Sequence, residues 1–451
     1  MPIARGGELP DSGPDGHAGQ AGLGHFGSQP GRYPAPLSLG LANAYSTLRA
    51  VSNEYPRGEP FARTASQPQG SQVGEAGGPP PRLDVDHRLL KESFAHLAAE
   101  EPAAMEYFYA RLFAASPDTR ALFPMSMTEQ RKRMFLALAR LVWSLDSQPG
   151  STELLGQLGR VHRRFGVMDK HYETFFTALR DTAQHFIGTA WTAKTAAAWQ
   201  GALTFMSATM RSAAADDAEV GPAWWYAEIV SHEARSPGVA VLRLRPNQPL
   251  PYQAGQYVPV QVTRWPRVWR PYSIANAPRP AGLIELHVRA VPGGLVSNTL
   301  VHHSVAGDCV LLGAAAGSML LTDSDRDLLC IAGGTGLAPL KAIIEQALGT
   351  SPQGRQRKIT LFVGARQQFD LYDLEDLQLL EAACPGLQVL PVLSDEPGYG
   401  GLTGMLPDVV SGHGLFDTAE VYICGPAAMV RQTAALLASV PEGQVHHDPL
   451  P

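Results

Sequence analysis

The segment DLLCIAGGTGLAPLKAIIEQAL, residues 327–348, decides the fold of the C-terminal part of this 451-residue chain. Its first half is a short apolar run typical of a buried strand, and its second half carries apolar residues at helical spacing. The glycine turn between them, residues 333–336, would let backbone N–H groups approach a phosphate from a helix N-terminus. Taken alone, the turn is equally typical of a tight connection in any α/β fold.

The alternation of strand and helix continues in KITLFVGA (358–365) with LYDLEDLQLLEAA (371–383), LQVLPVL (387–393) with TGMLPDVV (403–410), and AEVYICG (419–425) with AAMVRQTAALLASV (427–440). This order predicts an α/β doubly wound parallel sheet over residues 326–451, with ligands at the carboxyl ends of its strands. CGPAAMV (424–430) also ends a strand, so two such turns could hold a dinucleotide between them. Cys424 would then face the reactive ring, although a free cysteine is usually a small buried hydrophobe.

Residues 222–322 change to a period of two, as in QYVPVQVT and LIELHVRA. Six short strands with turn signals predict a small antiparallel β-barrel, in which Pro259 must lie at an edge or a bulge. RPYSIANAP (270–278) offers Arg270 as a fork of donors for a phosphate, Tyr272 as a flat face for a ring and Ser273 as a short donor. GGLVSNTL (293–300) would bring backbone amides to a diphosphate.

Residues 83–215 have apolar side chains recurring at three and four, which predicts an all-α domain. His162 lies on the apolar face of its helix, and Tyr109 and Gln130 face inward in the same way. Each is compatible with a hydrogen-bonded core residue. Neutral imidazole is also what haem iron requires, and Phe123 lies in a turn where it could wedge a flat cofactor.

About one third of residues 1–82 are glycine or proline, which predicts a disordered extension. The net charge of -6 argues against a nucleic-acid partner. No apolar run is long enough for a signal peptide or a membrane span. Four widely spaced cysteines indicate neither disulfides nor zinc. We therefore expect a cytoplasmic protein that is a monomer or weak dimer.

The ordered set RxYS, GGxVS, GGTGxxP and CGPxxM resembles the ferredoxin reductase superfamily over residues 224–448. The resemblance implies an FAD-binding barrel followed by an NAD(P)H-binding domain. It implies flavin and diphosphate contacts for Arg270, Tyr272, Ser273, Gly293, Gly294, Val296 and Ser297. The residues implied around the nicotinamide nucleotide are Gly333, Gly334, Thr335, Gly336, Pro339, Cys424, Gly425 and Pro426.

The helical stretch resembles the globin half of a flavohaemoglobin, through YFYARLF, ALFP, EQRKRMF, LGRVHRRFGV followed by HYE, and AAW. The resemblance implies heme b, with His162 as the proximal iron ligand. Tyr109 and Gln130 would be the distal-side donors to bound oxygen. Phe123 and Met134 would form walls of the haem pocket, and Tyr172 would be the tyrosine on the proximal side. The implied activity is that of a nitric oxide dioxygenase, which passes electrons from NAD(P)H through FAD to haem and converts NO and O2 to nitrate.

Three positions depart from that family. An alanine in MRSAAADD stands where a glutamate usually reaches the proximal histidine, so the imidazole loses a hydrogen-bond acceptor. Val161 replaces a common lysine, and Leu450 lies near the usual site of an aromatic residue stacked on the flavin. Two other functions stay open: a haem-based sensor of O2, NO or redox state, and an NAD(P)H diaphorase or peroxide reductase with another acceptor.

Overall fold

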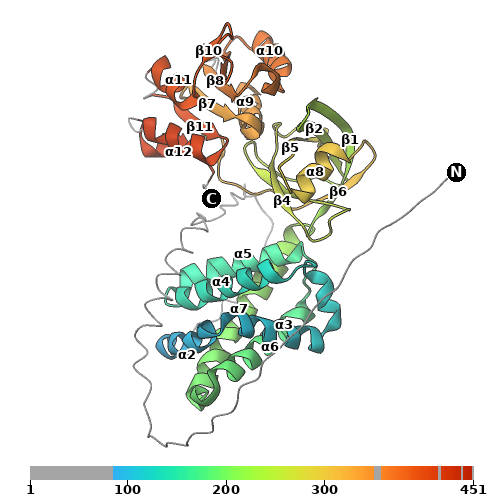
Figure 1. Ribbon diagram of the computed structural model, residues 1–451, viewed down its shortest axis with the longest axis vertical. Coiled ribbons are helices and arrows are strands. Elements are labelled where there is room, and N and C mark those ends of the chain that lie inside the picture. The colour runs from blue at the N-terminus through green and yellow to red at the C-terminus, as the bar shows by residue number, and fades with distance from the viewer. Residues whose placement is uncertain (1–84, 350–356, 415–417, 438–439, 449–451) are drawn as a thin grey trace, which may run out of the picture.

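The computed structural model describes residues 85–349, 357–414, 418–437 and 440–448. The predicted disordered extension, residues 1–82, and Leu450 lie outside these residues. Figure 1 shows a helical region, a barrel and a parallel-sheet region in chain order. The predicted fold class is confirmed in these three parts, whereas the domain limits at 82, 215, 222, 322 and 326 stay predictions.

In the part of the chain that the structure describes, the helical region contains six α-helices and two short 3-10 helices, η1 and η2 (Gly188–Ala190). Their bounds are α2 His87–Ala99, α3 Glu101–Ala115, η1 Pro117–Leu122, α4 Thr128–Ser144, α5 Gln148–Arg163, α6 Asp169–Ile187 and α7 Ala193–Val220. Pro102 near the start of α3 and Pro117 beyond its end limit that helix, because proline suits only the first helical turn.

The core of the helical region joins helices that are distant in the sequence. Trp199 of α7 is fully buried, and its indole Nε1 donates to Ser93 Oγ of α2 over 2.9 Å. The Phe94 ring of α2 lies 5.8 Å from Phe135 and 5.6 Å from Trp143, both on α4. Helices α5 and α7 approach so closely that a methyl group on Gly159 would overlap the backbone carbonyl of Met210.

The second region is a nearly closed antiparallel barrel. Its elements are β1 Trp225–Ser236, β2 Val239–Pro246, β3 Tyr257–Val262, β4 Arg270–Ser273, β5 Ile284–Arg289, α8 Leu295–His302 and β6 Cys309–Leu312. The strand order is β4-β3-β6-β1-β2-β5, and an isolated bridge between Ile274 and Leu286 brings the two ends together.

Pro259 does not lie at an edge as expected, because β3 pairs with both β4 and β6. It faces Pro271 across the β3–β4 ladder and lies just past the last β3–β6 pair, Val260 with Leu312. Its carbonyl accepts from Gly313 N over 2.7 Å. The missing N–H therefore falls at the end of one ladder, where few strand hydrogen bonds depend on it.

The third region is a parallel sheet in the order β10-β9-β8-β7-β11-β12. Its elements are β7 Leu328–Gly333, α9 Leu337–Gly349, β8 Ile359–Ala365, α10 Leu374–Ala383, β9 Leu387–Leu393, β10 Leu402–Thr403, α11 Leu406–His413, β11 Glu420–Cys424, α12 Ala427–Leu436 and β12 Val445–His446. Alternate residues of β7 enter two cores, one with α9 and α10 and one with α11 and α12. Helices therefore cover both faces (Figure 1).

Within the described ranges, no helix is long and apolar enough to cross a membrane.

The close packing of α5 against α7 at Gly159 can be tested by substitution. We expect Gly159→Ala to lower the free energy of unfolding of the helical region by about 1–3 kcal/mol, because the added methyl group must displace the Met210 backbone. Gly156→Ala, on the same helix, is the matched control, since its nearest neighbours would lie at 3.5–3.8 Å. Chemical denaturation followed by circular dichroism measures both, and equal effects would contradict the packing argument.

Candidate functional site

A cavity of about 1180 Å³ lies between the barrel and the carboxyl ends of the parallel strands. The barrel contributes Tyr272 and Ser273 of β4 and His287 and Arg289 of β5. The parallel sheet contributes the turns after β7 and β11, with the predicted residues Gly333, Gly334, Thr335, Gly336, Cys424, Gly425 and Pro426. Its size and its position at the strand ends suit a dinucleotide next to a flavin.

The turns after β7 and β11 meet inside this cavity because parallel pairing brings Cys424 opposite Ala332. A Cβ on Gly336 would overlap the carbonyl group of Cys424, so only glycine permits this approach. Burial, with the charge of Asp448, raises the pKa of the Cys424 thiol to about 12, so the thiol is protonated at neutral pH. The structure thus joins the two motifs that the sequence placed about ninety residues apart.

The other predicted flavin and nucleotide residues lie beside the cavity and do not line it. Gly294 caps the N-terminus of α8, Ser297 Oγ accepts from Val291 N over 3.3 Å, and Val296 is buried in the barrel core. Arg270 is exposed and donates to Trp269 O. Pro339 is buried in the first turn of α9. Their roles, including that of Gly293, stay predictions.

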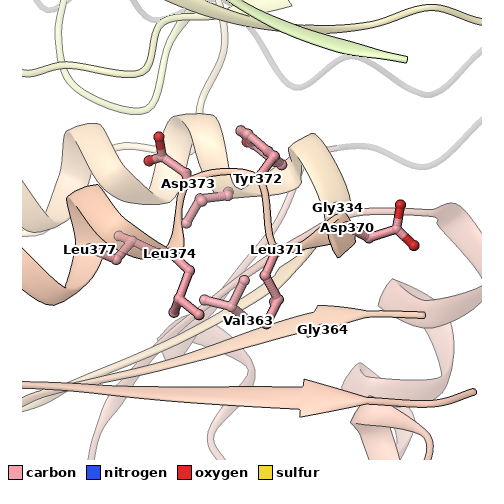
Figure 2. Close-up of a pocket in the computed structure, with 10 residues that line it drawn as sticks. Gly334, Val363, Gly364, Asp370, Leu371, Tyr372, Asp373, Leu374 and Leu377 are labelled. Carbon is pink, nitrogen blue, oxygen red and sulfur yellow. The ribbon is translucent and has the colours of Figure 1, made fainter. Parts of the chain in front are cut away.

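A second, smaller cavity of about 10 Å³ lies under the turn that precedes α10. Figure 2 shows Val363, Leu371 and Leu374 gathered there, with the Asp370 carboxylate turned away from them. This space holds at most one water molecule. The larger cavity is therefore the candidate ligand site.

Buried charged groups join the two sides of the large cavity, and sequence reasoning missed them. Lys341 Nζ of α9 donates to Asp373 Oδ2 over 2.7 Å and to Glu285 Oε1 of β5 over 3.2 Å. His287 bonds Tyr372 Oη over 2.8 Å and Glu285 over 3.2 Å. Glu285 and His287 alternate in LIELHVRA with apolar residues of the barrel core, and they pack against the parallel-sheet region.

The contacts of this network keep Glu285 and Lys341 ionised. Burial alone would raise the pKa of Glu285, but the hydrogen bond from His287 and the charges of Lys341 and Arg243 hold it well below its usual range. Burial alone would likewise lower the pKa of Lys341, but Asp373 and Glu285 raise it. The ionised pair of Lys341 and Glu285 therefore joins the parallel-sheet region to the barrel.

The helical region brings three of its predicted site residues together. Gln130 Nε2 donates to Tyr109 Oη over 3.3 Å, and the Phe123 ring lies 5.4 Å from the Tyr109 ring. Phe113, one turn after Tyr109, also contacts both aromatic rings, at 5.7 and 5.6 Å. Burial raises the pKa of Tyr109 to about 12, so the hydroxyl stays protonated. Because it accepts from Gln130, its own proton is available to another acceptor.

The remaining predicted residues fit a haem in their chemistry. Burial, with the charge of Arg164, lowers the pKa of His162 to about 4, so the imidazole is neutral, as an iron ligand must be. Met134 is half-buried against the helical core. Tyr172 is buried, and among the described residues its hydroxyl has no hydrogen-bond partner, so a bound group could satisfy it. Among the described residues, no hydrogen bond or ring contact joins His162 to Tyr109, Gln130 or Phe123.

Three family models match the chain in order: a globin at residues 106–210, an oxidoreductase FAD-binding domain at 226–319 and an oxidoreductase NAD-binding domain at 330–435. One relative is the ferredoxin–NAD(P)+ reductase component of naphthalene 1,2-dioxygenase/salicylate 5-hydroxylase systems from a Ralstonia species. It is 36% identical over 239 residues, which are 49% of this chain and 71% of that protein.

Another relative is the xylene/toluene monooxygenase electron transfer component of Pseudomonas putida. It is 35% identical over 196 residues, 43% of this chain and 55% of that protein, so the chain spans about half of its length. The flavohaemoglobin structure from Malassezia yamatoensis, with bound FAD and haem, matches with a TM-score of 0.59 and 18% identity over 81% of this chain and 98% of that one. That match shows the shared fold.

The three matched models define the class of protein: a globin followed by a reductase with an FAD-binding and an NAD-binding module. The chain belongs to the FAD- and NAD(P)-dependent reductases and is a flavohaemoglobin-type fusion, an oxidoreductase with haem, FAD and NAD(P) as cofactors.

The close approach of the turns after β7 and β11 can be tested by a substitution at Gly336. We expect Gly336→Ala to raise the KM for NAD(P)H by about tenfold or more, because the methyl group must separate the β7 and β11 turns. FAD content should not change. Gly398→Ala is the control, since its Cβ would have no neighbour within 4 Å. Reduction of ferricyanide measures the KM, and a value equal to that of the control would contradict the assignment.

The buried charges can be tested through Lys341→Met. We expect a loss of about 3 kcal/mol in the free energy of unfolding at pH 7, because Glu285 and Asp373 are left buried without their cation. Since the native pKa of Glu285 is depressed, its contribution is complete above its ordinary value of 4.5 and is lost as the pH falls below it. The difference from wild type should therefore shrink on acidification.

Denaturation of the full chain between pH 3 and 8 measures this dependence, with the exposed Lys358→Met as the matched control. A deficit for Lys341→Met that does not change with pH would rule out the buried ionic contribution.

Proposed function

We propose that the protein is a nitric oxide dioxygenase that uses NAD(P)H. In the balanced reaction, two molecules each of NO and O2 react with one NAD(P)H to give two nitrate ions, NAD(P)+ and one proton. The observation that carries the proposal is the Tyr109 hydroxyl, which accepts from Gln130 and so keeps its own proton for an acceptor in the pocket. Phe123 and Phe113 exclude water from the side that they cover.

The remaining steps would use residues of the large cavity and of the helical region. The turns at 333–336 and 424–426 would hold the nucleotide, and Tyr272 would orient the flavin ring. His162 would ligate the iron, and Met134 would form part of the pocket wall. When bound, FAD accepts the hydride and haem supplies the centre where O2 and NO combine. Tyr109 and Gln130 would stabilise negative charge that develops on oxygen.

The absorption spectrum and NO consumption of the purified full chain test the proposal. We expect haem and FAD together, with NO consumption that requires O2 and NADH or NADPH. A preparation that holds FAD but no haem, after expression with ample haem, would sink the dioxygenase assignment.

Two variants test the residue roles. His162→Ala should abolish haem binding while NAD(P)H still reduces the flavin, because the imidazole lies on another region of the chain. The exposed His185→Ala is the matched control. Tyr109→Phe should keep haem but lower NO consumption by about tenfold or more, through loss of one donor. Retained haem in His162→Ala would show that the ligand assignment is wrong.

A second candidate is a diaphorase or peroxide reductase with a different acceptor. It is favoured by one observation, because the relatives at 35–36% identity are named as reductase or electron transfer components of oxygenase systems. Comparison of the rates with NO, hydrogen peroxide and ferricyanide distinguishes it from the dioxygenase. A sensor role would be separated by deleting residues 1–80, which should leave NO consumption unchanged if the protein is the proposed enzyme.

A further inference from the structure

The segment Trp265–Trp269, which we call the docking loop, links the barrel to the helical region. Arg267 in this loop has φ 68°, the one positive value among the described non-glycine residues. A left-handed conformation costs a residue with a side chain roughly 1–2 kcal/mol, so it persists only where surrounding contacts impose it. The Arg267 N–H donates to the Oε1 of the buried Gln261 over 2.6 Å, which holds the backbone in this conformation.

The strained backbone directs the Arg267 side chain into the helical region. Its Nε donates to Ala121 O in η1 over 3.1 Å, and its Nη1 donates to Phe165 O over 3.0 Å. A Cβ on Gly166 would lie 3.6 Å from the same guanidinium. One arginine therefore holds two separate segments of the helical region against the barrel.

Aromatic contacts extend this interface. The Phe165 ring lies 6.5 Å from Trp269 at 82°, an edge-to-face arrangement. The Arg164 guanidinium carbon lies 5.2 Å from the centre of Phe165 and 5.7 Å from Trp269. Trp269 is 8% exposed, so the contact excludes most solvent. Such desolvated aromatic and arginine groups are typical of the energetic centre of an interface.

The positions of these residues in the chain connect the interface to both cofactor motifs. Phe165 follows the proposed iron ligand His162 by three residues, and Trp269 directly precedes Arg270 of the RPYS motif. Ala121 lies two residues before Phe123, which packs on Tyr109. The neighbouring Arg163 pairs with Asp217 and donates to Gly221 O over 2.9 Å, which ties the end of α5 to the connection between the regions.

We propose that Arg267 is a positioning residue that fixes the helical region against the barrel and so sets the rate at which electrons pass from the flavin to the haem. The rate of electron transfer falls steeply with separation, so a loosened interface slows this step and leaves the flavin chemistry intact. The step moves one electron from reduced flavin to ferric iron. The proposal rests on the shared FAD and haem cofactors and does not require NO to be the substrate.

Arg267→Met tests the proposal, because methionine keeps an unbranched side chain that reaches as far as the arginine Nε position and removes every donor. In anaerobic stopped-flow experiments with NAD(P)H, we expect haem reduction to slow about tenfold or more while flavin reduction and ferricyanide activity change less than about twofold. Arg267→Lys keeps one donor and should recover part of the rate. Arg264→Met, at an exposed position of the preceding turn, is the matched control.

Hydrogen–deuterium exchange of the full chain supplies a readout that does not depend on turnover. In Arg267→Met, peptides covering residues 117–125 and 163–168 should exchange faster, and peptides of α12 should not change. Wild-type haem reduction in Arg267→Met, or an equal fall in ferricyanide activity, would overturn the proposal. A chain that binds no haem would defeat the proposed function, and the exchange pattern of the interface would then decide whether Arg267 holds the two regions together.

Discussion

The contact of Lys341 with Glu285 and Asp373 is the interaction on which the ligand cavity depends. These charges lie out of solvent and come from the barrel on one side and the parallel-sheet region on the other. Separating the regions would break the contact of Lys341 with Glu285, while Asp373 would stay with Lys341 and Arg243 with Glu285. The network therefore holds β5 beside α9, and the cavity between them keeps the shape that a flavin and a nicotinamide nucleotide need.

Buried polar groups in the helical region also need hydrogen-bond partners, but not all of them have one there. Tyr109 finds Gln130, and its hydroxyl is left with a proton to donate. Among the described residues the Tyr172 hydroxyl has no hydrogen-bond partner, and the flavohaemoglobin resemblance implies a glutamate where this sequence has an alanine. The two residues proposed for the distal side thus form a hydrogen-bonded pair, whereas the tyrosine proposed for the proximal side has a hydroxyl without a partner among the described residues. This asymmetry distinguishes the site from the pattern that the flavohaemoglobin resemblance implies.

The sequence predicted the positions of the glycine turns well, because glycine marks places where the backbone must turn tightly or approach another group. The glycines of 333–336 and 424–426 mark turns wherever they occur, and the structure brings both turns to one cavity. Glu285 and His287 could not be found in this way, because alternation in a strand predicts which side chains share a face and says nothing of what covers that face. Pro259 was predicted to lie at an edge or a bulge, because proline has no N–H to donate to a strand ladder. It lies instead just past the end of the β3–β6 ladder, where few strand hydrogen bonds depend on that N–H.

The sequence by itself determined the three regions, their order and the motifs that we propose to bind cofactors, because periodicity, glycine turns and inward polar residues are local properties. Only the tertiary structure decided how the regions meet. The ion network across the cavity joins residues 56 and 32 positions apart, and the docking loop reaches segments 102 and 146 positions away. Such pairings depend on where folded surfaces come together in space, and no spacing along the chain encodes them.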